Sequence, residues 1–150
     1  MEIERKYIIE KIPFDLSPYK CRLIEQGYLS TEPVVRVRQD NDDYVLTYKS
    51  KGLLAREEYN LPLTKESYLH LREKCDGIII TKKRYEIPLD DTHTIELDCF
   101  EGEYEGLLLA EVEFADMEEA ENFTPPEWFG EDVTYSKKYH NSNMSLRKQS

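Results

Sequence analysis

The sequence has no long apolar run: none of its segments approaches the roughly 20 consecutive apolar residues that a membrane-spanning helix needs. It also has no low-complexity segment, no linker rich in glycine and serine, and no internal repeat. The first residues carry charges where a secretory signal needs an apolar stretch. These absences predict one domain over residues 1–150, located in the cytoplasm and without a membrane partner.

Cysteine is scarce, and Cys21, Cys75 and Cys99 show no spacing typical of metal ligands. We therefore expect reduced, mostly buried thiols, as in cytoplasmic proteins. The histidines are equally scattered, which favours surface positions over a metal site. They are His70, His93 and His140.

Basic residues are outnumbered: 20 lysines and arginines stand against 31 acidic residues, which gives a net charge of −11. Proteins that bind nucleic acid or anionic membranes usually need a basic surface, so this balance argues against both partners. It does not exclude a small polyanion held in an enclosed cationic site. The hydrophobic content of 39% is sufficient for a core in a chain of 150 residues.

Strand-like runs separated by turn signals dominate the chain. They cover residues 2–9, 20–30, 33–39, 43–49, 54–62, 78–88, 93–100 and 107–115. Helical spacing predicts a helix from Thr64, a good N-cap, to Cys75, with Gly77 as its stop, and a second helix over residues 116–122. The polar tail from Tyr135 is predicted to be partly helical. The predicted fold class is α+β, mainly antiparallel β: a barrel or a strongly curved sheet with a few external helices.

Charged residues alternate along several of these runs. In the opening stretch MEIERKYII, Glu2, Glu4 and Lys6 share one face of a strand, because successive side chains point to opposite faces. One interpretation is a sheet with one packed face and one face in water. Other runs, however, carry pairs of the same sign, which repel unless an ion of opposite sign lies between them. These pairs are Arg36 with Arg38, Lys82 with Arg84, Glu96 with Asp98, and Glu111 with Glu113.

If these faces point inward, the interior of a barrel has a cationic wall and an acidic wall, and such an interior must hold something charged. A polyphosphate with a divalent metal meets both demands. Arginine and lysine bind phosphate oxygens, whereas Mg²⁺ or Mn²⁺ takes carboxylate oxygens. The charged faces therefore favour a site for a small polyphosphate and Mg²⁺ or Mn²⁺.

The motif Glu2-x-Glu4-x-Lys6 resembles the ExExK signature of the CYTH superfamily, the triphosphate tunnel metalloenzymes. The resemblance continues in the same order along nearly the whole chain, and this ordered set is a much stronger signal than ExExK alone. The further segments are EQGYLS (25–30), RVRQ (36–39), TYKS (47–50), REE (56–58), TKKRYEI (81–87), IELDCFEGEYEGLLLAEVEF (95–114) and DVTYSKKYHNS (132–142). The resemblance implies an eight-stranded antiparallel tunnel that binds a triphosphate inside.

The resemblance also implies roles for individual side chains. The phosphate-binding residues would be Lys6, Arg36, Arg38, Lys49, Arg56, Lys82 and Arg84, with Lys137 or Lys138 from the C-terminal segment. The metal ligands would be Glu2, Glu4, Glu111 and Glu113, and the catalytic set would be Glu2, Glu4, Lys6 and Glu113. Ligand contact and structural support both stay open for Tyr28, Glu58, Glu96 and Asp98. Many members of the family carry an acidic residue where this chain has Asn60, so a role at that position stays open as well.

The implied activity is metal-dependent hydrolysis of a small triphosphate, with inorganic triphosphate favoured. One metal would bridge phosphate oxygens, a second would activate the attacking water, and a glutamate would accept its proton. Class IV adenylate cyclases and thiamine triphosphatases share the tunnel and are the alternative functions. A non-catalytic polyphosphate-binding module is a further alternative, but such a module could dispense with the acidic wall. The sequence leaves the oligomeric state open, a homodimer included.

Overall fold

The computed structural model describes residues 2–52 and 54–146, and its strands pair antiparallel throughout these ranges. The strands are β1 (Glu2–Ile8), β2 (Lys20–Thr31), β3 (Val34–Asp40), β4 (Asp43–Lys49), β5 (Ala55–Arg56), β6 (Glu58–Pro62), β7 (Asp76–Pro88), β8 (Thr94–Phe100) and β9 (Leu108–Glu113). The α-helices are α1 (Lys65–Arg72), α2 (Met117–Glu121) and α3 (Asn141–Leu146), and the short 3-10 helices are η1 (Gly102–Tyr104) and η2 (Lys137–Tyr139). None of the helices in the described ranges is long and apolar enough to cross a membrane. The predicted fold class is confirmed.

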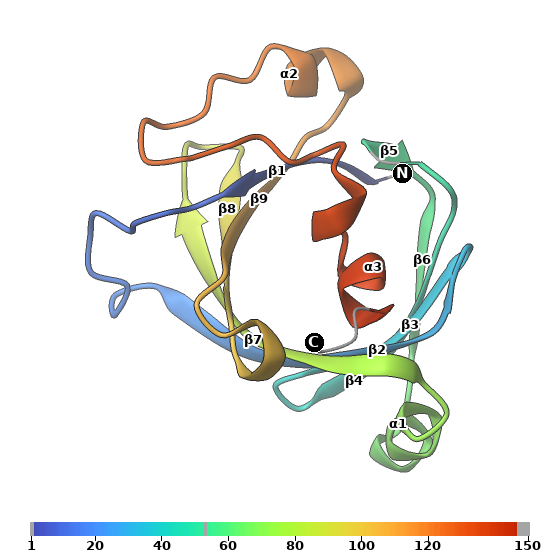
Figure 1. Cartoon of the computed structure of the whole chain (residues 1–150). Coiled ribbons are helices and arrows are strands. Elements are labelled where there is room, and N and C mark those ends of the chain that lie inside the picture. The colour runs from blue at the N-terminus through green and yellow to red at the C-terminus, as the bar shows by residue number, and fades with distance from the viewer. Residues whose placement is uncertain (1, 53, 147–150) are drawn as a thin grey trace.

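Two of the strands are parts of one interrupted strand. β5 pairs with β1 and β6 pairs with β4, at opposite ends of the strand order β5-β1-β9-β8-β7-β2-β3-β4-β6. Only Glu57 separates β5 from β6 along the chain, so this segment joins the two edges of the sheet. The strands consequently form a ring, which Figure 1 shows in a view along its axis. Counted as one, β5 and β6 occupy the single run predicted over residues 54–62.

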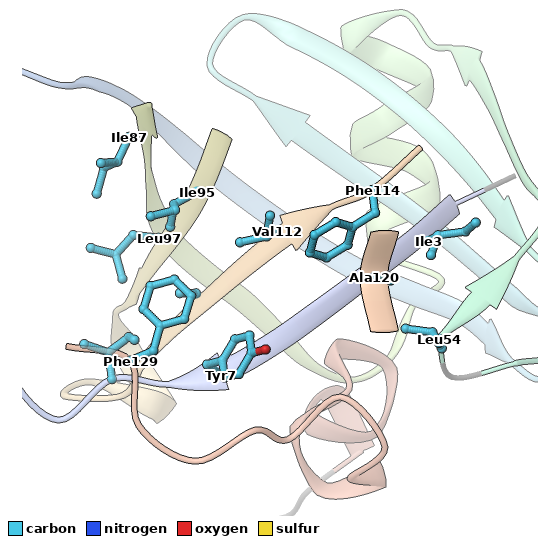
Figure 2. Packing of buried hydrophobic residues seen from close by; sticks show 12 residues of the cluster. Ile3, Tyr7, Leu54, Ile87, Ile95, Leu97, Val112, Phe114, Ala120 and Phe129 are labelled. Carbon is cyan, nitrogen blue, oxygen red and sulfur yellow. The ribbon is translucent and has the colours of Figure 1, made fainter. Parts of the chain in front are cut away.

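The larger hydrophobic core lies on the outer face of the ring, not inside it. Figure 2 shows Tyr7 of β1 beside Phe129 from the loop after α2, and the centroids of the two rings are 5.0 Å apart. Val112 of β9 and Ala120 of α2 are fully buried in the same cluster. The apolar halves of the alternating strands thus pack under α2 and the loop that follows it. Their charged halves face the interior of the ring.

The third helix differs from the prediction that the helices lie outside the sheet. α1 and α2 are external, but α3 lies inside the ring (Figure 1). Its Met144 is fully buried in a cluster with Ile80, Phe100 and Leu109, whose side chains form an apolar end of the interior. The hydroxyl of Tyr104 also donates to the carbonyl oxygen of Met144 at 2.6 Å. The tail has few apolar side chains and no clear helical spacing of them, so the sequence did not predict this position.

The boundaries of α1 were predicted well at its start and less well at its end. Thr64 is the N-cap and forms a capping box with Ser67, because each side chain accepts from the backbone N–H of the other. The helix ends at Arg72 rather than at Cys75. Gly77, predicted as the stop, lies within β7 with a positive φ of 72°.

The cysteines of the chain are free thiols. Cys75 and Cys99 are half-buried, whereas Cys21 is exposed, so the predicted burial was wrong for Cys21. Cys21 lies opposite Tyr85 near the start of β2, where its side chain reaches solvent.

Candidate active site

The ring encloses a cavity of about 250 Å³. Ten of the residues predicted for the site line it and come from β1, β3, β4, β5, β7 and β9. They are Glu2, Glu4, Lys6, Arg36, Arg38, Lys49, Arg56, Arg84, Glu111 and Glu113. Side chains that lie more than a hundred residues apart in the sequence therefore meet around one small space.

Three predicted phosphate-binding residues lie elsewhere. Lys82 is fully buried behind the cavity wall, where its ammonium group donates to Asp98 at 2.7 Å. Lys137 lines a neighbouring cavity of about 330 Å³. The ammonium group of Lys138 lies 5.3 Å from the ring centroid of Tyr139. Contact between these lysines and a ligand in the first cavity stays a prediction.

The pairing of β1 with β9 builds the acidic side of the cavity. Glu4 lies directly opposite Glu113, and Lys6 lies directly opposite Glu111. Because alternate residues share a face, all four side chains point to the interior. We use the name acidic wall for Glu4, Glu111 and Glu113.

Glu2 is held by basic residues. The ammonium group of Lys49 donates to both carboxylate oxygens at 3.0 Å, and Nε of Arg56 donates to one of them at 3.3 Å. Burial alone raises the pKa of Glu2, but Lys49 and Arg56 lower it more, so the net shift is downward. This ionised carboxylate therefore links β1 to β4 and β5 at the place where the two edges of the sheet meet and close the ring.

Glu111 is also ionised and paired. Its carboxylate lies 3.7 Å from the ammonium group of Lys6 and 3.8 Å from the guanidinium of Arg84. Burial raises its pKa, but the charges of Lys6 and Arg84 outweigh burial and hold the pKa well below the usual value. Lys6 additionally donates to the carbonyl oxygen of Tyr139 at 3.0 Å, which connects the site to the C-terminal segment.

Glu4 and Glu113 are in the opposite situation. Burial, followed by the charges of Glu111 and Glu2, raises the pKa of Glu4 well above its usual value. Glu113 is more exposed, and partial burial together with the neighbouring carboxylates, Glu2 first, raises its pKa as well. Within residues 2–52 and 54–146, neither carboxylate has an ion pair with a basic side chain. Each of the two carboxylates is therefore repelled by other carboxylates nearby, Glu111 and Glu2 for Glu4 and Glu2 for Glu113, and a bound cation would relieve this repulsion.

The donor set fits a hard divalent cation. No cluster of three acidic, histidine or cysteine side chains in the described part of the chain is close enough to hold a metal by itself. Mg²⁺, however, is commonly bound by one or two carboxylates together with substrate phosphate oxygens and water. Glu4 and Glu113 supply the carboxylates for such a site.

The basic side of the cavity contains a buried ionic cluster. Nε of Arg84 donates to Asp98 at 2.7 Å, and Lys82 donates to the other oxygen of the same carboxylate. Burial raises the pKa of Asp98, but Arg84 and Lys82 lower it more. Burial, with the charges of Arg84 and Arg38, lowers the pKa of Lys82 to about 7 although Asp98 opposes the shift. Asp98 is therefore shared by two basic side chains, of which Arg84 lines the cavity.

Arg36 and Arg38 complete the basic side from β3. The side chain of Arg36 is 5% exposed, and both arginines line the cavity. Burial, followed by the charges of Arg36 and Arg84, lowers the pKa of Arg38 to about 9. Crowding of positive charge at this wall is therefore only partly compensated by the protein, as expected for a site that receives an anion.

Sequence reasoning missed three titratable residues that line the cavity. Asp40 continues the alternation of Arg36 and Arg38 on β3, and this signal could have found it. Arg22, paired with Asp40 at 2.9 Å, had no comparable signal because its strand face continues with apolar Ile24.

His140 is the third missed residue, and the predicted surface position was wrong for it. Its side chain is 8% exposed and lines the cavity. Burial, together with the charges of Lys6 and Arg56, lowers its pKa to about 4, so the imidazole is neutral at pH 7. The position depends on the C-terminal segment entering the ring, which the spacing of the histidines does not reveal.

Comparisons with known proteins agree with this architecture. The chain is 38% identical over 149 residues to the inorganic triphosphatase of Nitrosomonas europaea, a match that covers 97% of each chain. It is also 38% identical over 148 residues to the inorganic triphosphatase of Acetivibrio thermocellus, covering 95% of this chain and 92% of the relative. A crystal structure of an inorganic triphosphatase superposes with a TM-score of 0.74 at 34% identity, covering 100% of this chain and 97% of the other. The family model of the CYTH domain matches residues 1–148, and the chain belongs to this family.

Proposed function

We propose that this chain is an inorganic triphosphatase: it hydrolyses a phosphoric anhydride bond of inorganic triphosphate with the help of a divalent metal. The observation that carries the proposal is one cavity of about 250 Å³ in which arginines of β3 face the acidic wall of β1 and β9. The full-length relatives at 38% identity that bear this name support it. A cytoplasmic location stays a prediction.

The basic side would hold the triphosphate. Arg36 and Arg38 offer planar donor groups that match phosphate oxygens, and Arg84 adds a third charge. Positive charge fixed in place before the reaction stabilises the charge that develops on the leaving phosphate. Lys82 would act indirectly, because it lies behind Arg84 and shares Asp98 with it.

The acidic wall would hold the metal, with Glu4 and Glu113 as the ligands that the geometry favours. A bound Mg²⁺ or Mn²⁺ would neutralise phosphate charge and lower the pKa of an attacking water. Glu2 and Glu111, predicted as ligands with them, are engaged by Lys49 and Lys6 and would orient these lysines toward the phosphates. The assignment of each glutamate is part of the proposal.

A substrate panel tests the activity. Phosphate release is measured from inorganic triphosphate, ATP, thiamine triphosphate and long-chain polyphosphate with Mg²⁺ or Mn²⁺, and cyclic AMP is measured in the ATP sample. We expect inorganic triphosphate to be hydrolysed fastest, because the cavity is lined mainly by charged groups and a nucleoside adds bulk. Faster formation of cyclic AMP would establish a cyclase instead. Tight binding without turnover of any compound would establish a non-catalytic module.

The two arginines of β3 give a second test. We expect Arg36→Ala and Arg38→Ala each to raise the KM for triphosphate, since a hydrogen bond to a charged group contributes about 1.5–3 kcal/mol. Arg→Lys should restore the loss only in part, because the planar fork is absent. Lys83→Ala is the matched control, since Lys83 is exposed on β7 and pairs with Glu101 outside the ring. Alanine variants with an unchanged KM would remove β3 from the substrate site.

A further inference from the structure

Arg36 and Arg38 differ from the other basic residues of the site in the groups that hold them. Lys49 and Arg56 contact Glu2, Lys82 and Arg84 contact Asp98, and Lys6 contacts Glu111. In the part of the chain that the structure describes, neither Arg36 nor Arg38 has an ion pair with a carboxylate. Their side-chain partners are neutral.

Gln26 is the neutral partner of Arg38. It lies on β2 directly opposite Arg38, and its side chain is fully buried. Its Oε1 accepts a hydrogen bond from Nε of Arg38 at 2.7 Å. The opposite orientation of the amide would place two donors against each other, so this contact requires the oxygen to face the arginine.

The contact with Gln26 leaves the two terminal nitrogens of the Arg38 guanidinium free to bind a ligand in the cavity. Because Gln26 occupies Nε, the two terminal nitrogens keep their donor capacity, and Arg38 lines the cavity. The amide nitrogen of Gln26 has no hydrogen-bond partner in the described structure although it is buried. Burying an unpaired hydrogen-bond donor is unfavourable, so the amide nitrogen of Gln26 lowers the stability of the folded protein.

Arg36 is held in a similar way. Its Nη2 donates to the hydroxyl oxygen of Thr47 at 3.3 Å, and this hydroxyl donates onward to the side-chain oxygen of Asn60 at 2.6 Å. Thr47 is fully buried. The hydroxyl proton is directed to Asn60, so a lone pair of the oxygen is left for Arg36.

We propose that Gln26 is a positioning residue for triphosphate: it orients the guanidinium of Arg38 through one neutral hydrogen bond and leaves the positive charge for the substrate. This inference rests on the proposed function, because it names a determinant of substrate affinity in the same site. A carboxylate at position 26 would keep the geometry, but it would form an ion pair with Arg38. The charge of Arg38 would then be neutralised within the protein and not by the substrate. Thr47 has the corresponding role for Arg36.

The test is the near-isosteric variant Gln26→Glu, compared with Gln26→Met. The dissociation constant for triphosphate is measured by calorimetry in a chelator, and KM and kcat are measured with metal. We expect Gln26→Glu to weaken triphosphate binding about tenfold or more, because a full charge is neutralised beside a charge-assisted contact. Gln26→Met removes the orienting oxygen but no charge, and we expect it to weaken binding less than Gln26→Glu.

Gln39→Glu is the matched control. Gln39 precedes Asp40 on β3, on the face opposite to that of Arg38, and its amide nitrogen donates to the carbonyl oxygen of Asn41 at 3.0 Å. The variant adds the same charge to the same hairpin but outside the cavity. We expect its affinity for triphosphate to stay within about twofold of the wild type, since exposed charges are screened.

Thr47→Val covers the case in which Gln26→Glu does not fold. It removes only the acceptor of Arg36, and we expect a several-fold weaker affinity for triphosphate. Wild-type affinity in Gln26→Glu, or in both Gln26→Met and Thr47→Val, would overturn the inference. A wild-type protein that neither binds nor hydrolyses triphosphate would instead refute the proposed function. The two failures are therefore distinguishable.

Discussion

Glu4 lies where burial and neighbouring carboxylates both oppose its ionisation. An acid whose pKa is raised on folding destabilises the folded state increasingly as pH rises above its ordinary pKa of 4.5. Glu4→Gln removes this repulsion and keeps the shape. We expect the metal-free variant to be at least as stable as the wild type at pH 7, with the difference growing between acidic and neutral pH. Urea unfolding at several pH values measures it.

The same substitution should nearly abolish turnover. Glu4 is a proposed metal ligand, and we therefore expect kcat to fall by more than about 100-fold, since even indirect support of metal ligands contributes 10–100-fold. Glu10→Gln is the control, because Glu10 is exposed beyond the end of β1. Normal turnover in Glu4→Gln, with an unchanged thermal shift on addition of Mn²⁺, would mean that Glu4 does not bind the metal and that β1 has only a structural role.

His140 gives the molecule a predictable response to acid. Its pKa is lowered from 6.5 to about 4 on folding, so the unfolded chain binds more protons in this interval. Stability contributed by His140 is therefore complete above pH 6.5 and falls as pH decreases toward 4, by up to about 3 kcal/mol. We expect His140→Gln to flatten the fall in unfolding free energy over this interval. His70→Gln at an exposed position should leave it unchanged, and equal slopes in both variants would contradict the assignment.

Among the elements, α3 carries the most specific packing prediction. Met144 is fully buried inside the ring, whereas Met117 of α2 is 39% exposed. We expect Met144→Ala to lower the free energy of unfolding by about 2–5 kcal/mol, because a cavity is left in the cluster with Ile80 and Phe100. Met117→Ala is the matched control and should cost less than about 1 kcal/mol. Equal losses in urea unfolding would mean that α3 does not pack inside the ring.

The strands were largely predictable because their signal repeats along each run. Ile3, Arg5 and Tyr7 alternate with Glu2, Glu4 and Lys6, and this period of two is enough to assign β1 and its charged face. Which face points inward does not follow from alternation alone. The pairs of like charge and the family resemblance were needed to infer that the charged faces point inward and form the candidate site.

The parts that could not be predicted depend on contacts between distant segments. His140 and Met144 enter the ring only because the C-terminal segment turns back through it, and no local pattern encodes that path. Glu2 has an ion pair with a basic side chain and Glu4 has none. This difference likewise arises only because Lys49 of β4 meets β1 where the two edges of the sheet come together. The sequence therefore predicts which charged side chains point to the interior of the ring, but it does not predict which of them form ion pairs with one another.

At the scale of the whole molecule, an acidic protein encloses a cationic wall. Arg36 and Arg38 have no carboxylate partner in the described ranges, so an anion should stabilise the fold even without metal. At 100 times its dissociation constant, triphosphate in a chelator stabilises the folded state by about 2.7 kcal/mol. For a chain of 150 residues, this corresponds to a rise in Tm of roughly 5–10 °C.

Thermal melting with and without triphosphate measures this effect. Sodium sulfate at the same ionic strength is the control for general salt effects. The double variant Arg36→Ala, Arg38→Ala should lose most of the shift. A shift of equal size in sulfate would mean that the interior does not recognise the triphosphate.

The pairing of β1 with β9 also determines when the site can exist during protein synthesis. Glu4 leaves the ribosome before its partner Glu113, which follows only after seven other strands have been made. Pairing over such a distance along the chain is slow to nucleate. The hairpin of β3 and β4, which holds Arg36 and Arg38, closes locally and can form much earlier. A nascent chain can therefore form the hairpin with Arg36 and Arg38 before it contains Arg84, Glu111 or Glu113, and the complete cavity must wait for β9.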